Sequence, residues 1–379
     1  MQLTEERMER FSRNLPIERM HAAWESGKIV GGAGAFPFEM TVPGTVVPTA
    51  GVTVVGTVPT HRRRGVLRSL MRAQLDDVHE RGEPVALLWA SEDTIYGRFG
   101  YGMASRTGRI SIPKEHSAFA RPLEREGTLR IVDADEALTL FPRVWNIVRR
   151  RVPGMLARTR NWWELRVLFE PPGGGEDGPK RLVVLERDGR PEGYAIYRHK
   201  PKWDEGVSNS ELQVVEAVAL DGRPTAELWR YLLDIDWAAE ITAGLLPVDH
   251  PLWWLLATPR RMRLRIGDGL WVRLVDVGTA LSARRYAADG AVILDVVDDF
   301  CPWNAGTCGS RTGARGGRRA LRSCAVTSLR SARPTSAGST SRSSYEAVAS
   351  RNCGAEPLRV RTRCSRPTAR PGVPRSSER

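Results

Sequence analysis

The sequence predicts an α/β (α+β) protein in which two tandem domains are built on mixed sheets. The first observation is a change of hydrophobic period. Residues 51–58 (GVTVVGTV) form an apolar, β-branched run that Pro59 ends, and residues 67–80 then carry apolar side chains at helical spacing. A second buried strand is expected at residues 85–90 (VALLWA). Strand, loop, helix and strand in this order predict a right-handed βαβ unit.

The second observation is that this order recurs from about residue 129. A helical stretch around residues 141–148 precedes residues 181–200, where two alternating strands flank an Asp188-Gly189 turn. A strand at residues 211–220 and a helix near residues 227–236 follow. We expect a second domain of similar build, closed by a pair of strands in the segment DGLWVRLVDV.

This repetition divides the chain into four expected regions. The first domain takes residues 1–125 and the second takes residues 126–285. Residues 286–306 read as the remnant of a third domain, opened by a strand at 291–299 (AVILDVVDD), and residues 307–379 as an Arg/Ser-rich, disordered tail.

The net charge of +13 would by itself favour a nucleic-acid or membrane-surface partner. The charge is concentrated in one region, however. Residues 307–379 hold 16 Arg, no Lys and three acids, whereas the first 306 residues hold 41 basic and 41 acidic side chains. The part with a folded composition is neutral, which argues against nucleic acid as its partner.

The tail contains no Ile, Phe, Trp or Met, so it cannot bury enough apolar area to offset its ordering entropy. Two interpretations stay open: a basic low-complexity tail that binds nucleic acid, and a reading-frame shift that replaces a folded domain. Four of the five cysteines also lie here, with only Cys301 before them. Their spacing matches no zinc pattern, so no metal is expected.

The start of the chain is charged, and no run of eighteen apolar residues occurs. We therefore expect a cytoplasmic protein without a membrane partner.

A basic loop precedes the first predicted helix. In the segment PTHRRRGVLR three arginines, Arg62 to Arg64, lead through Gly65 into the helix. A helix start offers unpaired backbone N–H groups and the positive end of the macrodipole, and arginine pairs with phosphate in bidentate fashion. The loop suits a pyrophosphate, although a solvated basic turn would have the same residues.

A second motif, ASEDTIYGRFGYG, follows the strand at residues 85–90. Together the two motifs resemble the paired signatures of the Eis-type branch of the GNAT acetyltransferases, and PGMLAR, GYAIYR and DGLWVRLVDV extend the similarity to about residue 305. The resemblance implies tandem GNAT domains, acetyl-coenzyme A as co-substrate and an amine acceptor. It also implies a sterol-carrier-like third domain, here truncated, and a ring-like homo-hexamer.

The resemblance places the site residue by residue. Backbone groups of Val55 and Thr57 would contact the pantetheine arm, and Ser91 and Ile95 would line the thioester end. Tyr96 would be the general acid, with Tyr101 as its nearest rival. The pyrophosphate and its surroundings would be held by Arg62, Arg63, Gly65, Val66, Leu67 and Arg68.

Transfer is expected to be direct, because no Cys or Ser of the core shows the signature of an activated nucleophile. The acceptors implied are aminoglycoside-like or lysine-like amines. In this family the base is the carboxylate of the C-terminus, whereas this chain ends Glu378-Arg379, and it starts without the usual additional strand and helix. A coenzyme A-binding protein that lacks the base, and so lacks catalysis, is the alternative.

Overall fold

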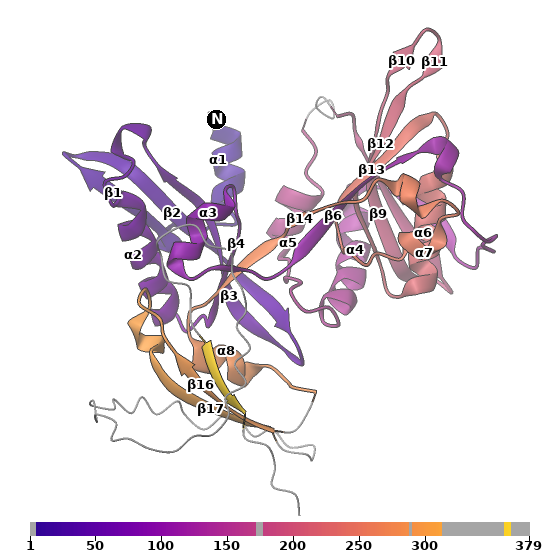
Figure 1. Cartoon of the computed structure of the whole chain (residues 1–379). Helices are drawn as coiled ribbons and strands as arrows, with labels where there is room; N and C mark the ends of the chain where they lie inside the picture. Colours follow the sequence, from indigo (N-terminus) through magenta and orange to yellow (C-terminus); the bar gives the residue numbers. More distant parts are fainter. Residues whose placement is uncertain (1–4, 172–176, 288–289, 313–359, 365–379) are drawn as a thin grey trace, which may run out of the picture.

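In the computed structural model, residues 5–171, 177–287, 290–312 and 360–364 are described. They form two lobes and a small third sheet below the first lobe (Figure 1). The expected α/β class with mixed sheets is confirmed. In the described part of the chain, no helix is long and apolar enough to cross a bilayer.

The first lobe is built on a six-stranded mixed sheet. Only β3 and β4 run parallel, and they flank the helix α2 (Val66–Glu80), so the predicted βαβ unit is confirmed. The strands in spatial order are β1 (Met20–Glu25), β2 (Lys28–Val42), β3 (Thr45–Thr57), β4 (Val85–Trp89), β15 (Leu270–Leu274) and β5 (Gly102–Met103).

Alternation along β4 divides the core of this lobe between the two faces of the sheet. Ala86 and Leu88 pack with Met71 and Leu75 of α2 on one face. Val85 and Leu87 belong to a cluster on the other face, which α8 (Val277–Ala283) covers through Ala280. Both faces of β4 are therefore buried, as its continuous apolar sequence requires.

The second lobe holds a seven-stranded sheet. The predicted Asp188-Gly189 turn joins β8 to β9 with both residues at positive φ, as a two-residue hairpin needs. The strands in spatial order are β14 (Arg265–Asp268), β6 (Arg106–Pro113), β13 (Ala238–Leu246), β12 (Ser210–Ala219), β9 (Arg190–Lys200), β8 (Lys180–Arg187) and β7 (Thr128–Val132).

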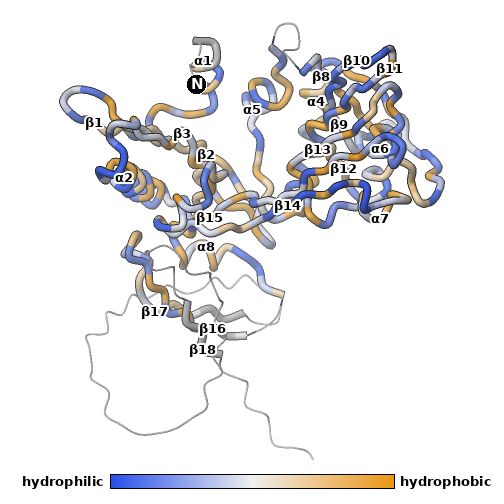
Figure 2. The backbone as a smooth tube through the Cα atoms, turned by 45° about the horizontal axis from the view of Figure 1, so that its top comes forward, coloured by the Kyte–Doolittle hydropathy of each residue, from blue (hydrophilic) through white to orange (hydrophobic). Residues whose placement is uncertain are grey.

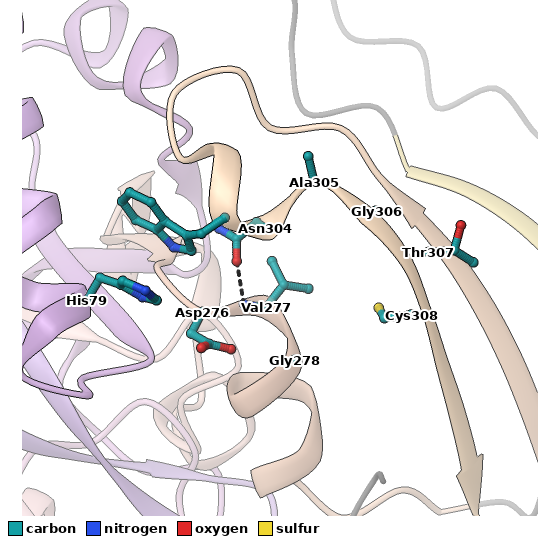
Figure 3. Close-up of a pocket in the computed structure, with 10 residues that line it drawn as sticks. His79, Asp276, Val277, Gly278, Asn304, Ala305, Gly306, Thr307 and Cys308 are labelled. Carbon is teal, nitrogen blue, oxygen red and sulfur yellow. Dashed lines mark hydrogen bonds between the residues drawn. The ribbon is translucent and has the colours of Figure 1, made fainter. Parts of the chain in front are cut away.

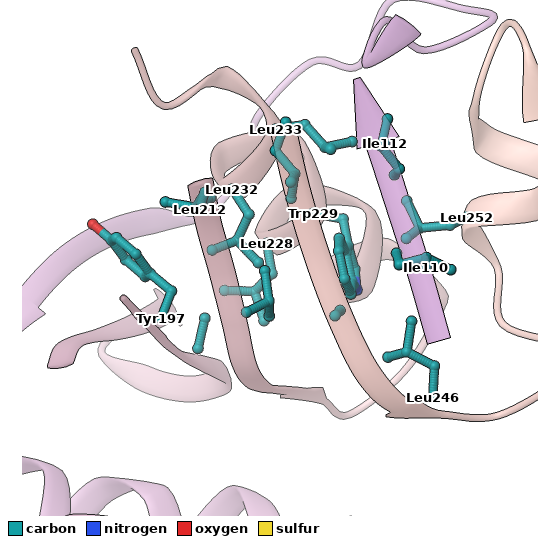
Figure 4. Close-up of a cluster of buried hydrophobic side chains, with 14 of the residues drawn as sticks. Ile110, Ile112, Tyr197, Leu212, Leu228, Trp229, Leu232, Leu233, Leu246 and Leu252 are labelled. Carbon is teal, nitrogen blue, oxygen red and sulfur yellow. The ribbon is translucent and has the colours of Figure 1, made fainter. Parts of the chain in front are cut away.

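Helices cover both faces of this sheet. Figure 4 shows one face, where Leu228, Trp229 and Leu232 of α6 (Gly222–Asp234) pack on the sheet, with Leu252 of α7 (Leu252–Leu255) beside them. The helix α4 (Ala134–Arg149) covers the other face. A small hairpin of β10 (Trp203–Asp204) and β11 (Val207–Ser208) extends from this lobe.

A two-stranded ribbon connects the lobes. Outgoing β5 and β6 pair with returning β15 and β14, and Ser105 and Leu270 continue the hydrogen bonding between the two pairs. Figures 1 and 2 show the returning run passing from one lobe to the other.

This ribbon changes the strand membership expected at residues 125 and 285. β6 lies before residue 125 but belongs to the second sheet, and β15 was expected to close the second domain but lies in the first sheet. The alternating pattern identified β15 as a strand. A local pattern does not specify which sheet a strand joins, because that pairing is long-range.

The lobes also meet along β2. Residues 154–157 pair with its end: the Thr41 N–H donates to the Met155 carbonyl (2.9 Å) and the Gly154 N–H to the Thr41 carbonyl (2.8 Å). Phe36 and Phe38 of β2 pack edge-on against Trp162 of α5 (Arg160–Trp162), with α1 (Glu5–Ser12) beside them through Phe11. This face of β2 is thus buried by the second lobe.

The third sheet confirms the strand expected after residue 290. β16 (Gly290–Val296) lies between β17 (Gly306–Thr312) and β18 (Val360–Cys364). Two stretches of the expected disordered tail are thus strands, because backbone pairing does not require apolar side chains. The rest of that tail, residues 313–359 and 365–379, lies outside the described residues.

Candidate active site

The candidate site begins where β3 and β4 separate. Their parallel pairing covers only Thr49–Val85, Ala50–Ala86 and Gly51–Leu87, yet β3 continues to Thr57 and β4 to Trp89. β3 keeps its pairing with β2 up to Thr57. The backbone of β3 beyond Gly51 therefore has no partner from β4, and an extended ligand can pair with it.

A bulge marks the unpaired half of β3. The register with β2 shifts between Gly32 and Gly34, and Val54 takes a left-handed φ of 47°. A β-branched residue adopts this conformation only at a cost, which persists where the surroundings impose it. The bulge is followed by Val55, which is half-buried, and by Thr57, whose enclosed hydroxyl has no hydrogen-bond partner in the described part of the chain.

The loop between β3 and α2 presents a helix N-terminus to solvent. Arg63 and Gly65 have φ of 62° and 84°, and Gly65 is the N-cap of α2. No atom lies within 4 Å of a Cβ built on Gly65, so the glycine is required by its φ and not by crowding. Among the described residues no side chain caps the first N–H groups of α2, at Val66, Leu67 and Arg68, so an anion can bind them.

The three arginines of the loop differ in their partners. Arg64 forms a bidentate ion pair with Glu25 at the end of β1, with N···O distances of 2.5 and 3.0 Å, and His61 lies 2.7 Å from the same carboxylate. Arg62 and Arg63 are exposed and form no ion pair with a described residue. Two unneutralised guanidiniums thus stand next to the positive end of α2.

Tyr96 lies across the strand opening, at the end of the short helix α3 (Asp93–Tyr96). Ser91 is exposed in the turn between β4 and α3. One hydrophobic cluster includes Tyr96 and has Val55, Leu67 and Ile95 packed against it. The structure therefore brings together side chains from β3, α2 and α3 that the sequence motifs had connected.

The surroundings of the hydroxyl group distinguish the two tyrosines. Tyr96 is 7% exposed and Tyr101 3%, with their rings 6.0 Å apart in a T-shaped arrangement. Burial raises the pKa of Tyr96, and it raises the pKa of Tyr101 far more. The Tyr101 hydroxyl is enclosed and has no hydrogen-bond partner among the described residues, so Tyr96 is the tyrosine that a ligand can reach.

The second lobe repeats the diverging parallel strands but not the anion site. β12 and β13 pair only from Ser210 to Val214, and α6 follows β12. Asp221 caps α6 by accepting from the Arg223 N–H (3.0 Å), and Arg223 turns back onto the buried Glu227 (3.2 Å). A carboxylate therefore occupies the helix end where a phosphate would bind.

A separate cavity of about 170 Å³ lies at the opposite end of α2. Figure 3 shows it between His79 of α2, Asp276 and Val277 at the start of α8, and Thr307 and Cys308 of β17. His79 is about 20 Å from Val66 at 1.5 Å per helical residue. The cavity is thus remote from the basic loop.

Comparison with known proteins shows which family the chain resembles. One model of an acetyltransferase (GNAT) domain matches residues 1–104, and another matches residues 154–274. An uncharacterized N-acetyltransferase of Streptomyces avermitilis is 42% identical over 293 residues, which are 76% of this chain and 71% of that protein. The N-acetyltransferase Eis of Mycobacterium tuberculosis is 35% identical over 287 residues, 73% of this chain and 68% of Eis.

The chain belongs to the Eis-type GNAT acetyltransferases. The crystal structure of Eis1 from Mycobacterium abscessus is similar, with a TM-score of 0.65 and 35% identity over 79% of this chain and 77% of that chain. A GCN5-related N-acetyltransferase from Anabaena variabilis, at 20% identity and a TM-score of 0.69, shares the fold. This Eis-type protein is therefore an acetyltransferase with acetyl-coenzyme A as co-substrate.

Sequence reasoning missed two charged residues near Tyr96 in this acetyltransferase. Arg273 of β15 and Asp298 beyond β16 form a buried ion pair next to the turn that follows Tyr96. The available signal was a charged residue inside the apolar alternation WVRLVDV, since a charge at a buried strand position requires a partner.

Proposed function

We propose that this acetyltransferase transfers the acetyl group of acetyl-coenzyme A directly to the nitrogen of an amine, with Tyr96 as the general acid. The observation that supports this most strongly is the convergence of three features. The strands β3 and β4 diverge, and Tyr96 packs on the same cluster as Val55 and Leu67. At the opening, Arg62 and Arg63, which form no ion pair with a described residue, flank the N-terminus of α2.

The cofactor would lie along the opening. Backbone groups of Val55 and Thr57 would pair with the amides of the pantetheine arm, as an added strand does. The pyrophosphate would accept hydrogen bonds from the N–H groups of Val66 to Arg68 and from Arg62 and Arg63, and Gly65 would allow the close approach. Ser91 and Ile95 would then lie at the thioester end, near Tyr96.

The chemical step balances without a covalent enzyme intermediate. The lone pair of a neutral amine attacks the thioester carbonyl, the C–S bond breaks, and the thiolate takes the phenolic proton of Tyr96. Solvent then reprotonates the tyrosinate, and the nitrogen loses its extra proton. With ordinary pKa values of about 10 and 8.5, the proton transfer is uphill by roughly 2 kcal/mol. Burial raises the pKa of Tyr96, but it also raises the pKa of a thiol in the same site, which offsets much of that increase.

The acceptor belongs to the same proposal. Aminoglycoside-like and lysine-like amines are the classes inferred, and both are mostly protonated at neutral pH, so the neutral fraction limits attack. The sterol-carrier-like nature of the region after residue 286 and a homo-hexamer are further proposals that rest on the family resemblance alone. A cytoplasmic location is also a proposal, and it rests on the lack of a run of eighteen apolar residues in the sequence.

The test is thiol release from acetyl-coenzyme A in the presence of an aminoglycoside panel, a lysine peptide and an alcohol as the control acceptor. We expect amine-dependent release and an N-acetylated product by mass spectrometry. If calorimetry shows that coenzyme A binds but no amine causes thiol release, the proposal is contradicted. That result would favour a coenzyme A-binding protein that lacks catalysis.

A further inference from the structure

A segment outside both matched GNAT regions completes the core next to Tyr96. After β16 the chain turns back, and Phe300 and Cys301 join the hydrophobic cluster that contains Tyr96, with 6% and 0% exposure. The ring of Phe300 lies 5.2 Å from that of Phe99 and 4.2 Å from the guanidinium carbon of Arg72 on α2. The segment therefore contacts both α2 and the turn after Tyr96.

Asp298 anchors this segment. Its carboxylate accepts from Arg273 Nη2 at 2.6 and 2.7 Å, from the Cys301 N–H at 2.9 Å and from Asn304 Nδ2 at 2.9 Å. The side chains of Arg273 and Asp298 are 1% and 2% exposed. Two charges so completely removed from water have a large desolvation cost, which makes a buried pair a poor source of stability. Stability alone therefore does not account for this pair.

The guanidinium of Arg273 packs against the backbone of Gly100, four residues after Tyr96. A Cβ on Gly100 would overlap the Arg273 guanidinium, with Cζ only 2.6 Å away, so a larger residue there would have to displace the side chain that pairs with Asp298. Gly100, at φ 81°, ends the 3₁₀ turn Gly97–Phe99 that begins directly after Tyr96. Its N–H donates to the Gly97 carbonyl (3.0 Å), and the Tyr101 N–H donates to the Tyr96 carbonyl (3.3 Å).

We propose that the Arg273–Asp298 pair positions the general acid. The Arg273 guanidinium packs against Gly100, so the pair holds the Gly97–Gly100 turn in place and thereby fixes where the Tyr96 hydroxyl points. Both residues act through Tyr96 and neither touches the substrate. The inference rests on the proposed role of Tyr96 as acid. A displacement of the reacting group by about 1 Å can reduce the rate by about 100-fold, so loss of this support reduces kcat without affecting the phosphate loop.

The decisive variant replaces both partners, since removal of one leaves an uncompensated buried charge and can unfold the protein. In R273M/D298L two apolar side chains of similar size fill the same space. We expect a melting temperature close to that of the wild type, an unchanged Kd for coenzyme A, and a kcat lowered by about 10- to 100-fold. The matched control is R19M/E83L, which removes another buried pair of the first lobe (2.6 Å, 7% and 9% exposed) and is expected to leave kcat unchanged.

Two further variants keep the proposal falsifiable. R273K keeps the positive charge opposite Asp298 and replaces the planar guanidinium next to Gly100, and we expect a smaller loss of kcat from it even if the double replacement does not fold. In the Y96F background, R273M/D298L should cause no additional loss of kcat, because the hydroxyl that the ion pair positions is absent.

A folded R273M/D298L or a folded R273K with wild-type kcat would overturn the positioning role, and so would a full additional loss in the Y96F background. Wild-type kcat in Y96F alone would instead refute Tyr96 as the acid. The two failures are therefore distinguishable.

Discussion

Arg64 pairs with Glu25 through its two terminal guanidinium nitrogens, Nη2 at 2.5 Å and Nη1 at 3.0 Å, so this ion pair ties the loop before α2 to the end of β1. The neighbouring Arg62 and Arg63 have no such partner among the described residues. Three consecutive arginines therefore have two tasks: one holds the loop, and two remain available for an anion.

Replacement of these arginines by alanine should separate the two tasks. We expect R62A and R63A each to raise the Kd for coenzyme A by about 10-fold or more, since a hydrogen bond to a charged group contributes about 1.5–3 kcal/mol. R64A should raise the Kd less, because Arg64 already pairs with Glu25. Calorimetry with coenzyme A and with dephospho-coenzyme A measures this order. The reverse order, with R64A the weakest binder, would remove the basis for assigning the phosphate to Arg62 and Arg63.

Loss of the Tyr96 hydroxyl should affect the chemical step. We expect Y96F to reduce kcat by about 100-fold or more with little change in KM for acetyl-coenzyme A, since general acid catalysis contributes about 10²–10⁴-fold. Y101F is the control: it keeps the ring and removes an enclosed hydroxyl without a hydrogen-bond partner in the described part of the chain. Its kcat should equal that of the wild type, and a larger loss in Y101F than in Y96F would exchange the two roles.

The pH dependence of kcat follows from the raised pKa of Tyr96. A general acid must be protonated to act, so its contribution is present below the raised pKa and is lost as the pH rises through it. We expect no alkaline decline in kcat below about pH 10, the ordinary pKa of tyrosine. The profile should be recorded with an acceptor of low amine pKa. A decline near pH 8 that Y96F abolishes would show that the pKa is lowered instead.

His250 should make stability depend on pH in mildly acidic solution. Burial lowers its pKa from 6.5 to about 4, and its Nδ1 accepts from the Leu252 N–H at 3.2 Å. In the unfolded chain this histidine binds a proton more readily than in the folded protein. The free energy of unfolding is therefore highest above pH 6.5 and declines as the pH falls toward 4, by up to about 3 kcal/mol. H250N keeps an acceptor at the Nδ1 position. Urea denaturation of H250N should show a weaker decline in this range, and an unchanged slope would exclude His250 as the cause.

Local sequence patterns predicted the elements of the site but not all of their partners. The period change before α2, the glycine at its start and the tyrosine after β4 follow from neighbouring residues. The partners of Arg64 and Arg273 lie 39 and 25 residues away in the sequence, and their pairing depends on the packing of the sheets. For the same reason β15 was recognised as a strand but assigned to the wrong sheet.

The place of β15 between β4 and β5 constrains how the protein can be made. The ribosome delivers Val85–Trp89 long before Leu270–Leu274, so the growing chain keeps an open edge on its first sheet while the whole second lobe is synthesised. Unpaired edges of this kind recruit strands from other chains. Expression should therefore depend on chaperones, and a product that stops before Leu270 should aggregate.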